Sequence, residues 1–119
     1  MAGETKKEIV IESLGGLCPV QANGTIDGEP FYFRARHEHW RVEIGPGNTH
    51  LVVEAMEAHP HDRAEWDRVE GLPTWEYEER YSDEEYAAGY MTEEEARAFM
   101  AKAADLWRAR PSTEEPNRG

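Results

Sequence analysis

The first part of the chain alternates apolar and polar side chains with a period of two, which is the pattern of half-buried β-strands. A stretch rich in β-branched residues over 8–14 predicts the first strand, and alternating stretches follow over 19–26, 31–36 and 40–44. Asp27-Gly28 lies between the second and third stretches and predicts a tight hairpin, because both turn residues tolerate a positive φ. The connections are short, and a parallel crossover needs many more residues, so the pattern predicts an antiparallel meander.

The alternation also assigns one side of each strand to the core. The side chains expected to face inward are Val20, Ala22, Gly24, Ile26, Phe31, Phe33, Ala35, Trp40, Val42 and Ile44. The side chains expected to face outward are Tyr32, Arg34, Arg36, Arg41 and Glu43. The β-branched run at residues 50–56 predicts a fifth strand. A last strand is expected over residues 74–81, with Trp75, Tyr77 and Tyr81 along it.

Helical signals appear in the second half of the chain. Residues 61–71 predict a short helix, with Asp62 as its N-cap and Gly71 as its terminator. Ser82 with Glu85 has the spacing of a capping box, the pairing that marks the start of a helix.

A second helix, over residues 93–110, is the clearest element of the sequence. Thr92 with Glu95 forms another capping-box pattern at its start, and Pro111 ends it. Apolar residues at three- and four-residue spacings form one stripe along this helix: Ala96, Phe99, Met100, Ala103 and Trp107.

These elements predict an α+β fold, with an antiparallel β-meander sheet of about five or six strands and one C-terminal amphipathic helix packed on a face. A chain of 119 residues suffices for one domain with a core. Apolar residues make up only 39%, but four Trp, five Tyr and three Phe supply large areas to bury. We expect a single domain over residues 1–110 and a disordered C-terminal tail over residues 111–119.

Composition excludes several classes of function. Cys18 is the only cysteine, so the chain has neither an internal disulfide nor a Cys-x-x-Cys zinc motif, and we expect a buried structural thiol. The net charge of −12 argues against unaided binding to nucleic acid or to an anionic membrane. No apolar run is long enough for a signal peptide or a membrane span, so a cytoplasmic protein is expected. Hydrolase, phosphate-loop and dinucleotide-binding motifs are missing from the sequence.

Residues 76–95 concentrate the negative charge, with nine acidic residues, one basic residue and four of the five tyrosines. The candidate partner-binding residues in this segment are Glu76, Tyr77, Glu78, Glu79, Tyr81, Asp83, Glu84, Glu85, Tyr86 and Tyr90. Carboxylates interspersed with phenols resemble the charge and the flat rings of a nucleic acid, which its binding proteins grip with Lys, Arg and stacking surfaces. Tyrosine also supplies rigid contact area at interfaces.

A structural explanation of the same segment stays open. Acidic residues at helix N-termini are favoured by capping and by the helix dipole, which accounts for Glu84, Glu85 and residues 93–95 if helices begin there. The tyrosines can pack on the sheet, and strong negative charge alone keeps a small protein dissolved.

The favoured function is a small non-enzymatic binding or inhibitor protein. Its partner is expected to be a protein with a basic surface, by analogy a nucleic-acid-binding enzyme such as the bacterial nucleases that phage-type antagonists block. No cofactor is expected on this hypothesis.

Two alternatives remain. Four of the five histidines form His-x-His pairs, His37 with His39 and His59 with His61, which suggests a zinc enzyme if the pairs converge. The turns that carry them favour exposed polar loops instead. The other alternative is a small-molecule or nucleotide-binding module, with a pocket formed by Tyr32, Arg34, Arg36, Trp40 and Arg41. Cross-strand pairing of these arginines with Glu43 and neighbouring acids is the simpler explanation.

Overall fold

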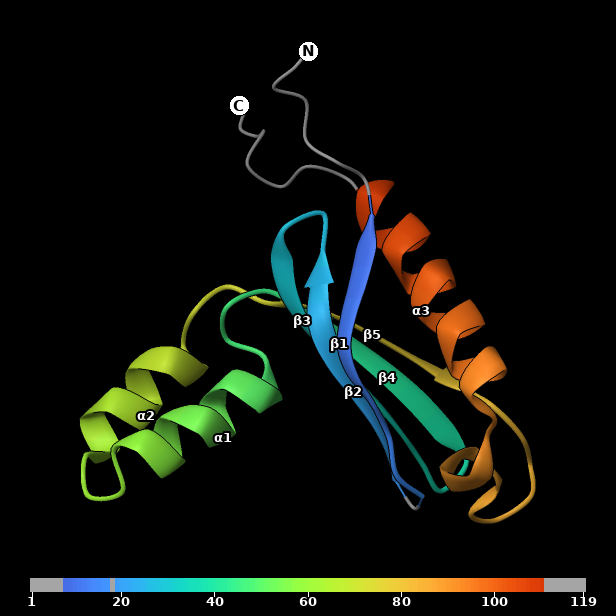
Figure 1. Cartoon of the computed structure of the whole chain (residues 1–119), viewed down its shortest axis with the longest axis horizontal. Helices are drawn as coiled ribbons and strands as arrows, with labels where there is room; N and C mark the ends of the chain where they lie inside the picture. Colours follow the sequence, from blue (N-terminus) through green and yellow to red (C-terminus); the bar gives the residue numbers. More distant parts are fainter. Residues whose placement is uncertain (1–7, 18, 111–119) are drawn as a thin grey trace.

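The computed structural model describes residues 8–17 and 19–110 (Figure 1). Its elements in chain order are the strands β1 (Ile9–Gly15), β2 (Val20–Ile26), β3 (Glu29–Arg36) and β4 (His39–Ile44), the helices α1 (Thr49–Ala58) and α2 (Arg63–Glu70), the strand β5 (Trp75–Arg80), the 3-10 helix η1 (Ala87–Tyr90) and the helix α3 (Glu93–Arg108). The expectations for Cys18 and for the tail at 111–119 fall outside the described residues.

The five strands form one antiparallel sheet in the order β1-β2-β3-β4-β5, so each strand pairs with its neighbour in the chain. This confirms the predicted α+β fold with its meander sheet. The Asp27-Gly28 hairpin is present, with φ values of 52° and 85°. Arg108 also donates two hydrogen bonds to the Asp27 carboxylate, with both N–O distances at 2.8 Å. The β2–β3 hairpin is thereby tied to the end of α3.

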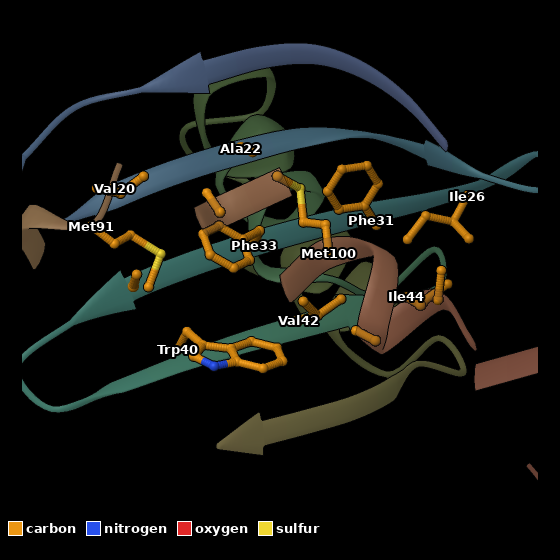
Figure 2. Packing of buried hydrophobic residues seen from close by; sticks show 14 of the residues in the cluster. Val20, Ala22, Ile26, Phe31, Phe33, Trp40, Val42, Ile44, Met91 and Met100 are labelled. Atoms are coloured by element: carbon orange, nitrogen blue, oxygen red, sulfur yellow. The ribbon is translucent and has the colours of Figure 1, made fainter. Parts of the chain in front are cut away.

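One face of the sheet packs against α3, as expected. Figure 2 shows the labelled side chains of β2, β3 and β4 gathered on this face, with Met100 of α3 among them. Trp40 is 1% exposed and stacks on Phe99 of α3, with ring centroids 4.8 Å apart. The Thr92–Glu95 capping box forms as predicted, and α3 ends at Arg108, two residues earlier than expected.

The prediction of a strand over residues 50–56 is wrong, because this segment belongs to α1. The prediction gave weight to adjacent β-branched valines and missed the N-cap before them. Asn48 is 1% exposed, and its side-chain oxygen accepts a hydrogen bond from Leu51 N at 3.0 Å. Glu43 adds a second anchor by accepting a hydrogen bond from Thr49 N at 2.6 Å. A helix start with these partners outweighs a modest β propensity. The short helix predicted over 61–71 is confirmed as α2, with Asp62 and Gly71 as its caps.

Helix α1 also changes the environment of the outer sheet face. Glu43 was expected in solvent but is 4% exposed, since it binds Thr49 and Arg41. Tyr32 is 8% exposed, and its ring stacks on His50 of α1 at 6.4 Å. Figure 1 shows α1 and α2 as a pair that extends away from one end of the sheet, on the side opposite α3.

The capping-box spacing of Ser82 and Glu85 does not start an α-helix. Ser82 Oγ accepts a hydrogen bond from Glu84 N at 3.0 Å, two residues on instead of three. The chain then turns through a left-handed Tyr86 into η1, which a continuous helix cannot do. No helix within residues 8–17 and 19–110 is long and apolar enough to cross a membrane.

Close strand approach at Gly24 gives a stability prediction. A Cβ at Gly24 would lie 1.9 Å from Val10 O, whereas one at Gly15 would meet no atom within 4 Å. Gly24→Ala is therefore expected to lower the free energy of unfolding by about 1–3 kcal/mol. Gly15→Ala is expected to change it by less than about 0.5 kcal/mol. Urea unfolding of both variants tests this, and equal midpoints would contradict the register of β1 against β2.

Candidate functional site

Strand β5 divides the acidic, tyrosine-rich segment between the two faces of the sheet. Tyr77 and Glu79 lie on the α3 side, where Tyr77 contacts the core and Glu79 binds Lys102. Glu76 and Glu78 alternate with them and are exposed on the opposite face. The predicted surface is therefore not continuous along the chain.

Tyr77 and Tyr81 pack against the aromatic core. The Tyr77 ring centroid lies 5.6 Å from that of Trp40, and the Tyr81 ring meets Phe99 edge-on at 5.9 Å. The Tyr81 hydroxyl donates to the Glu95 carboxylate at 3.0 Å. Burial first, and then this hydrogen bond, raises the pKa of Tyr81. Both rings hold the sheet against α3, so their role is structural.

Glu79 is engaged within the protein as well. Its carboxylate accepts hydrogen bonds from Lys102 Nζ at 2.6 Å and from the Tyr77 hydroxyl at 3.0 Å. The hydrogen bond from Lys102 is the main reason that the pKa of Glu79 is lowered. Donation to Glu79 is in turn the main reason that the pKa of Tyr77 is raised. This carboxylate joins β5 to α3 and is not offered to a partner.

The segment between β5 and α3 differs, because it forms an open groove of about 910 Å³. The groove is lined by Tyr81, Ser82, Glu84, Glu85, Tyr86, Ala87, Tyr90 and Glu95. Tyr86 is 51% exposed and Tyr90 is 62% exposed, so both phenols are accessible. We call these lining residues the acidic groove.

The charge around the acidic groove has one sign. Residues 82–95 contain six acidic residues and no basic residue. Asp83, Glu84 and Glu85 are exposed and precede no α-helix, so helix capping does not account for them. Residues 93–95 do lie in the first turn of α3, where the helix dipole favours acids. The structural explanation thus covers only part of the charge.

Tyr86 is held in a backbone conformation that a bulky residue rarely adopts. Its φ is 68°, in the left-handed region, and its ring contacts the His37 ring at a centroid distance of 5.6 Å. Ala88 N donates to His37 O at 2.9 Å, which fastens η1 to the β3–β4 turn. Non-glycine residues in this region cost free energy, and such positions cluster at functional sites.

The two histidine pairs are not brought together. His37 and His39 lie at the β3–β4 turn, beside η1, whereas His59 and His61 lie at the α1–α2 turn. Figure 1 shows these two turns on opposite sides of the molecule. Within the part of the chain that the structure describes, no group of three or more His, Cys, Asp or Glu side chains is placed to hold a metal ion. The zinc alternative therefore lacks a convergent ligand set in these residues.

The predicted small-molecule pocket is divided between the two faces of the sheet. Trp40 is buried on the α3 side, while Arg34, Arg36 and Arg41 lie on the opposite face with Tyr32. Trp40 therefore cannot line a site with these arginines. Sequence reasoning also missed which tyrosines are exposed. The sequence did carry one signal for this difference: the alternation typical of a strand ends after residue 81, so the later tyrosines need not face the core.

Comparison of the chain with protein-family models, with curated proteins and with solved structures found no match.

The ion pair between Glu79 and Lys102 predicts a pH effect. A carboxyl whose pKa is lowered in the folded state stabilises the fold above its unfolded pKa, and this contribution is lost as the pH falls through the folded pKa. Lys102→Gln should raise the pKa of Glu79 toward its ordinary value and should weaken this acid dependence. Carboxyl NMR titration of Glu79 in both proteins measures the effect. An identical titration would show that the pair does not form.

The left-handed Tyr86 predicts an unusual order of stability among its variants. Glycine adopts this φ without strain, whereas alanine keeps the strain and loses the ring. Tyr86→Gly should therefore be more stable than Tyr86→Ala by about 1 kcal/mol. Chemical unfolding of the two variants decides this, and an alanine variant that matches or exceeds the glycine variant would refute the conformation.

Proposed function

We propose that the protein is a small non-enzymatic binding protein that engages a basic surface of another protein through the acidic groove. The observation that carries the proposal is that exposed carboxylates and exposed phenols line the same open groove. Glu84 and Glu85 supply negative charge, and Tyr86 and Tyr90 supply ring faces. A lysine or arginine side chain is attracted to both, by Coulomb attraction and by cation–π interaction.

The supporting frame suits recognition because both ends of the groove segment are fixed. Tyr81 is packed against α3 at one end, and the Thr92–Glu95 capping box holds the other. Between them, the hydrogen bond from Ala88 N to His37 O fastens η1 to the sheet. A binding surface that is ordered before it meets its partner pays less conformational entropy on association.

The partner class that we propose is a nucleic-acid-binding enzyme. Its basic groove is built for closely spaced anions beside flat rings, which the exposed acids and phenols of residues 82–95 reproduce in part. The protein would then act as an inhibitor that occupies the polynucleotide site, as phage-type antagonists of bacterial nucleases do. The net charge of −12 supports rapid steering toward such a surface at low salt.

The test uses the full chain as bait in a nuclease-treated lysate of its source cells. The groove variant carries Glu84→Gln and Glu85→Gln, and it leaves Glu79 and Asp83 intact so that their ion pairs to Lys102 and Arg80 survive. The matched control carries Glu57→Gln and Glu70→Gln, which remove the same charge from exposed positions elsewhere. Wild type and control should retain the same basic protein, and the groove variant should lose at least about tenfold of it.

Elution separates the general proposal from the proposed partner class. If single-stranded or duplex DNA displaces the captured protein, that protein is a nucleic-acid-binding partner, as proposed. A retained basic protein that only salt displaces supports the groove but contradicts the nucleic-acid mimicry. Equal capture by the groove variant and the control would contradict the proposal itself.

A further inference from the structure

The sheet face opposite α3 carries a cluster of basic side chains in an otherwise acidic protein. The pairing register places Arg34 directly opposite Arg41, and it places His39 between Arg36 and Arg80. We call these five residues the arginine face. The chain has 25 acidic residues and only 13 lysines and arginines, and four of its ten arginines lie on this one face of three adjacent strands.

Two of these arginines have acidic partners. Arg41 Nε donates to the Glu43 carboxylate at 3.0 Å, and its guanidinium lies 3.7 Å from Glu76. Arg80 pairs with Asp83 at 3.3 Å. Only the contact of Arg41 with Glu76 joins two strands, as the predicted cross-strand pairing requires, whereas the contacts with Glu43 and Asp83 are local. None of these contacts needs a ligand.

Arg34 and Arg36 make no ion pair with any residue in 8–17 or 19–110. Arg34 Nε is covered by the protein and has no hydrogen-bond acceptor there. Across the strands, Arg34 faces another arginine on one side and the neutral Gln21 on the other. Like charges directly opposite each other destabilise a sheet. Glu43 and Glu76 offset the charge of Arg41, but no described carboxylate pairs with Arg34.

The surrounding groups also point to an anion. Burial, with a further contribution from Glu43, raises the pKa of the Tyr32 hydroxyl, while Arg34, Arg36 and Arg41 act in the opposite direction. The Tyr32 hydroxyl donates to Gln21 Oε1 at 2.6 Å and so orients that side chain beside Arg34. Helix α1 covers only the Tyr32 end of this face.

We propose that the arginine face binds a small phosphate-bearing anion, held chiefly by Arg34 and Arg36. Guanidinium groups match phosphate oxygens with bidentate, charge-assisted hydrogen bonds. Arg34 and Arg36 are two residues apart on β3, so they lie on the same face of the sheet and can hold adjacent phosphoryl groups. The ligand is small because Glu76 and Glu78 border the face and because the net charge of −12 repels an extended polyanion. A phosphate group supplies the countercharge that Arg34 and Arg36 lack in the described residues. This site is separate from the acidic groove and does not depend on its function.

The test is an NMR titration of the labelled full chain with inorganic pyrophosphate, with ATP and with a single-stranded oligonucleotide, each at constant ionic strength. Pyrophosphate should produce saturable shifts at the Arg34 and Arg36 side chains and at His39, with a Kd of about 1 mM or tighter. Arg34→Gln with Arg36→Gln should weaken this binding about tenfold or more. The control pair Arg63→Gln with Arg97→Gln removes the same charge from exposed positions on α2 and α3 and should leave the binding unchanged.

The arms of the experiment distinguish the sources of the phosphate. ATP that binds no more tightly than pyrophosphate identifies the phosphoryl groups alone as the ligand, whereas tighter binding of ATP with shifts at the same residues identifies a nucleotide. Both outcomes support the proposal. Absence of saturation, equal weakening in the control pair, or binding of the oligonucleotide alone would overturn it. The amide spectrum of each variant confirms that its fold is retained, so a lost signal cannot be assigned to unfolding.

Discussion

The contact of Trp40 with α3 is the interaction on which the remaining architecture depends. The indole is buried among Phe33, Tyr77 and Phe99, with centroid distances between 4.8 and 6.2 Å. Because side chains alternate along a strand, an inward Trp40 determines which residues of β4 and β5 face the core. Tyr77 and Glu79 must then meet α3, and the arginines and Glu76 must face the other way. One buried ring thereby separates the acidic groove from the arginine face.

This separation allows a single small domain to present two surfaces of opposite charge. The groove segment is free of sheet alternation and exposes its carboxylates and two phenols together. The arginine face stays in the sheet, where the pairing register holds like charges side by side. The total charge of residues 76–95 does not reveal either surface, because the residues of β5 alternate between the two faces of the sheet. The net charge alone describes neither surface.

Local patterns predicted much of the fold and less of the site. Strand alternation, the Asp27-Gly28 turn and the Thr92–Glu95 box each act within a few residues, so they could be read directly. The helix over 50–56 is also secured locally, by the N-cap Asn48 and by Glu43 six residues before Thr49, but the adjacent valines hid this signal. Tyr81 is partly buried because it packs against α3, whereas Tyr86 is exposed. This difference depends on the position of α3, which the composition of the segment does not indicate.

The meander order of the sheet has a consequence for how the chain is made. Each strand finds its partner in the segment synthesised just before or after it, apart from β5, which returns to β4 across the α1–α2 pair. The helix that covers the apolar face, α3, follows all five strands in the chain and is synthesised after them. Until it emerges, the nascent sheet presents Phe31, Phe33 and Trp40 to its surroundings, a state that invites association with chaperones.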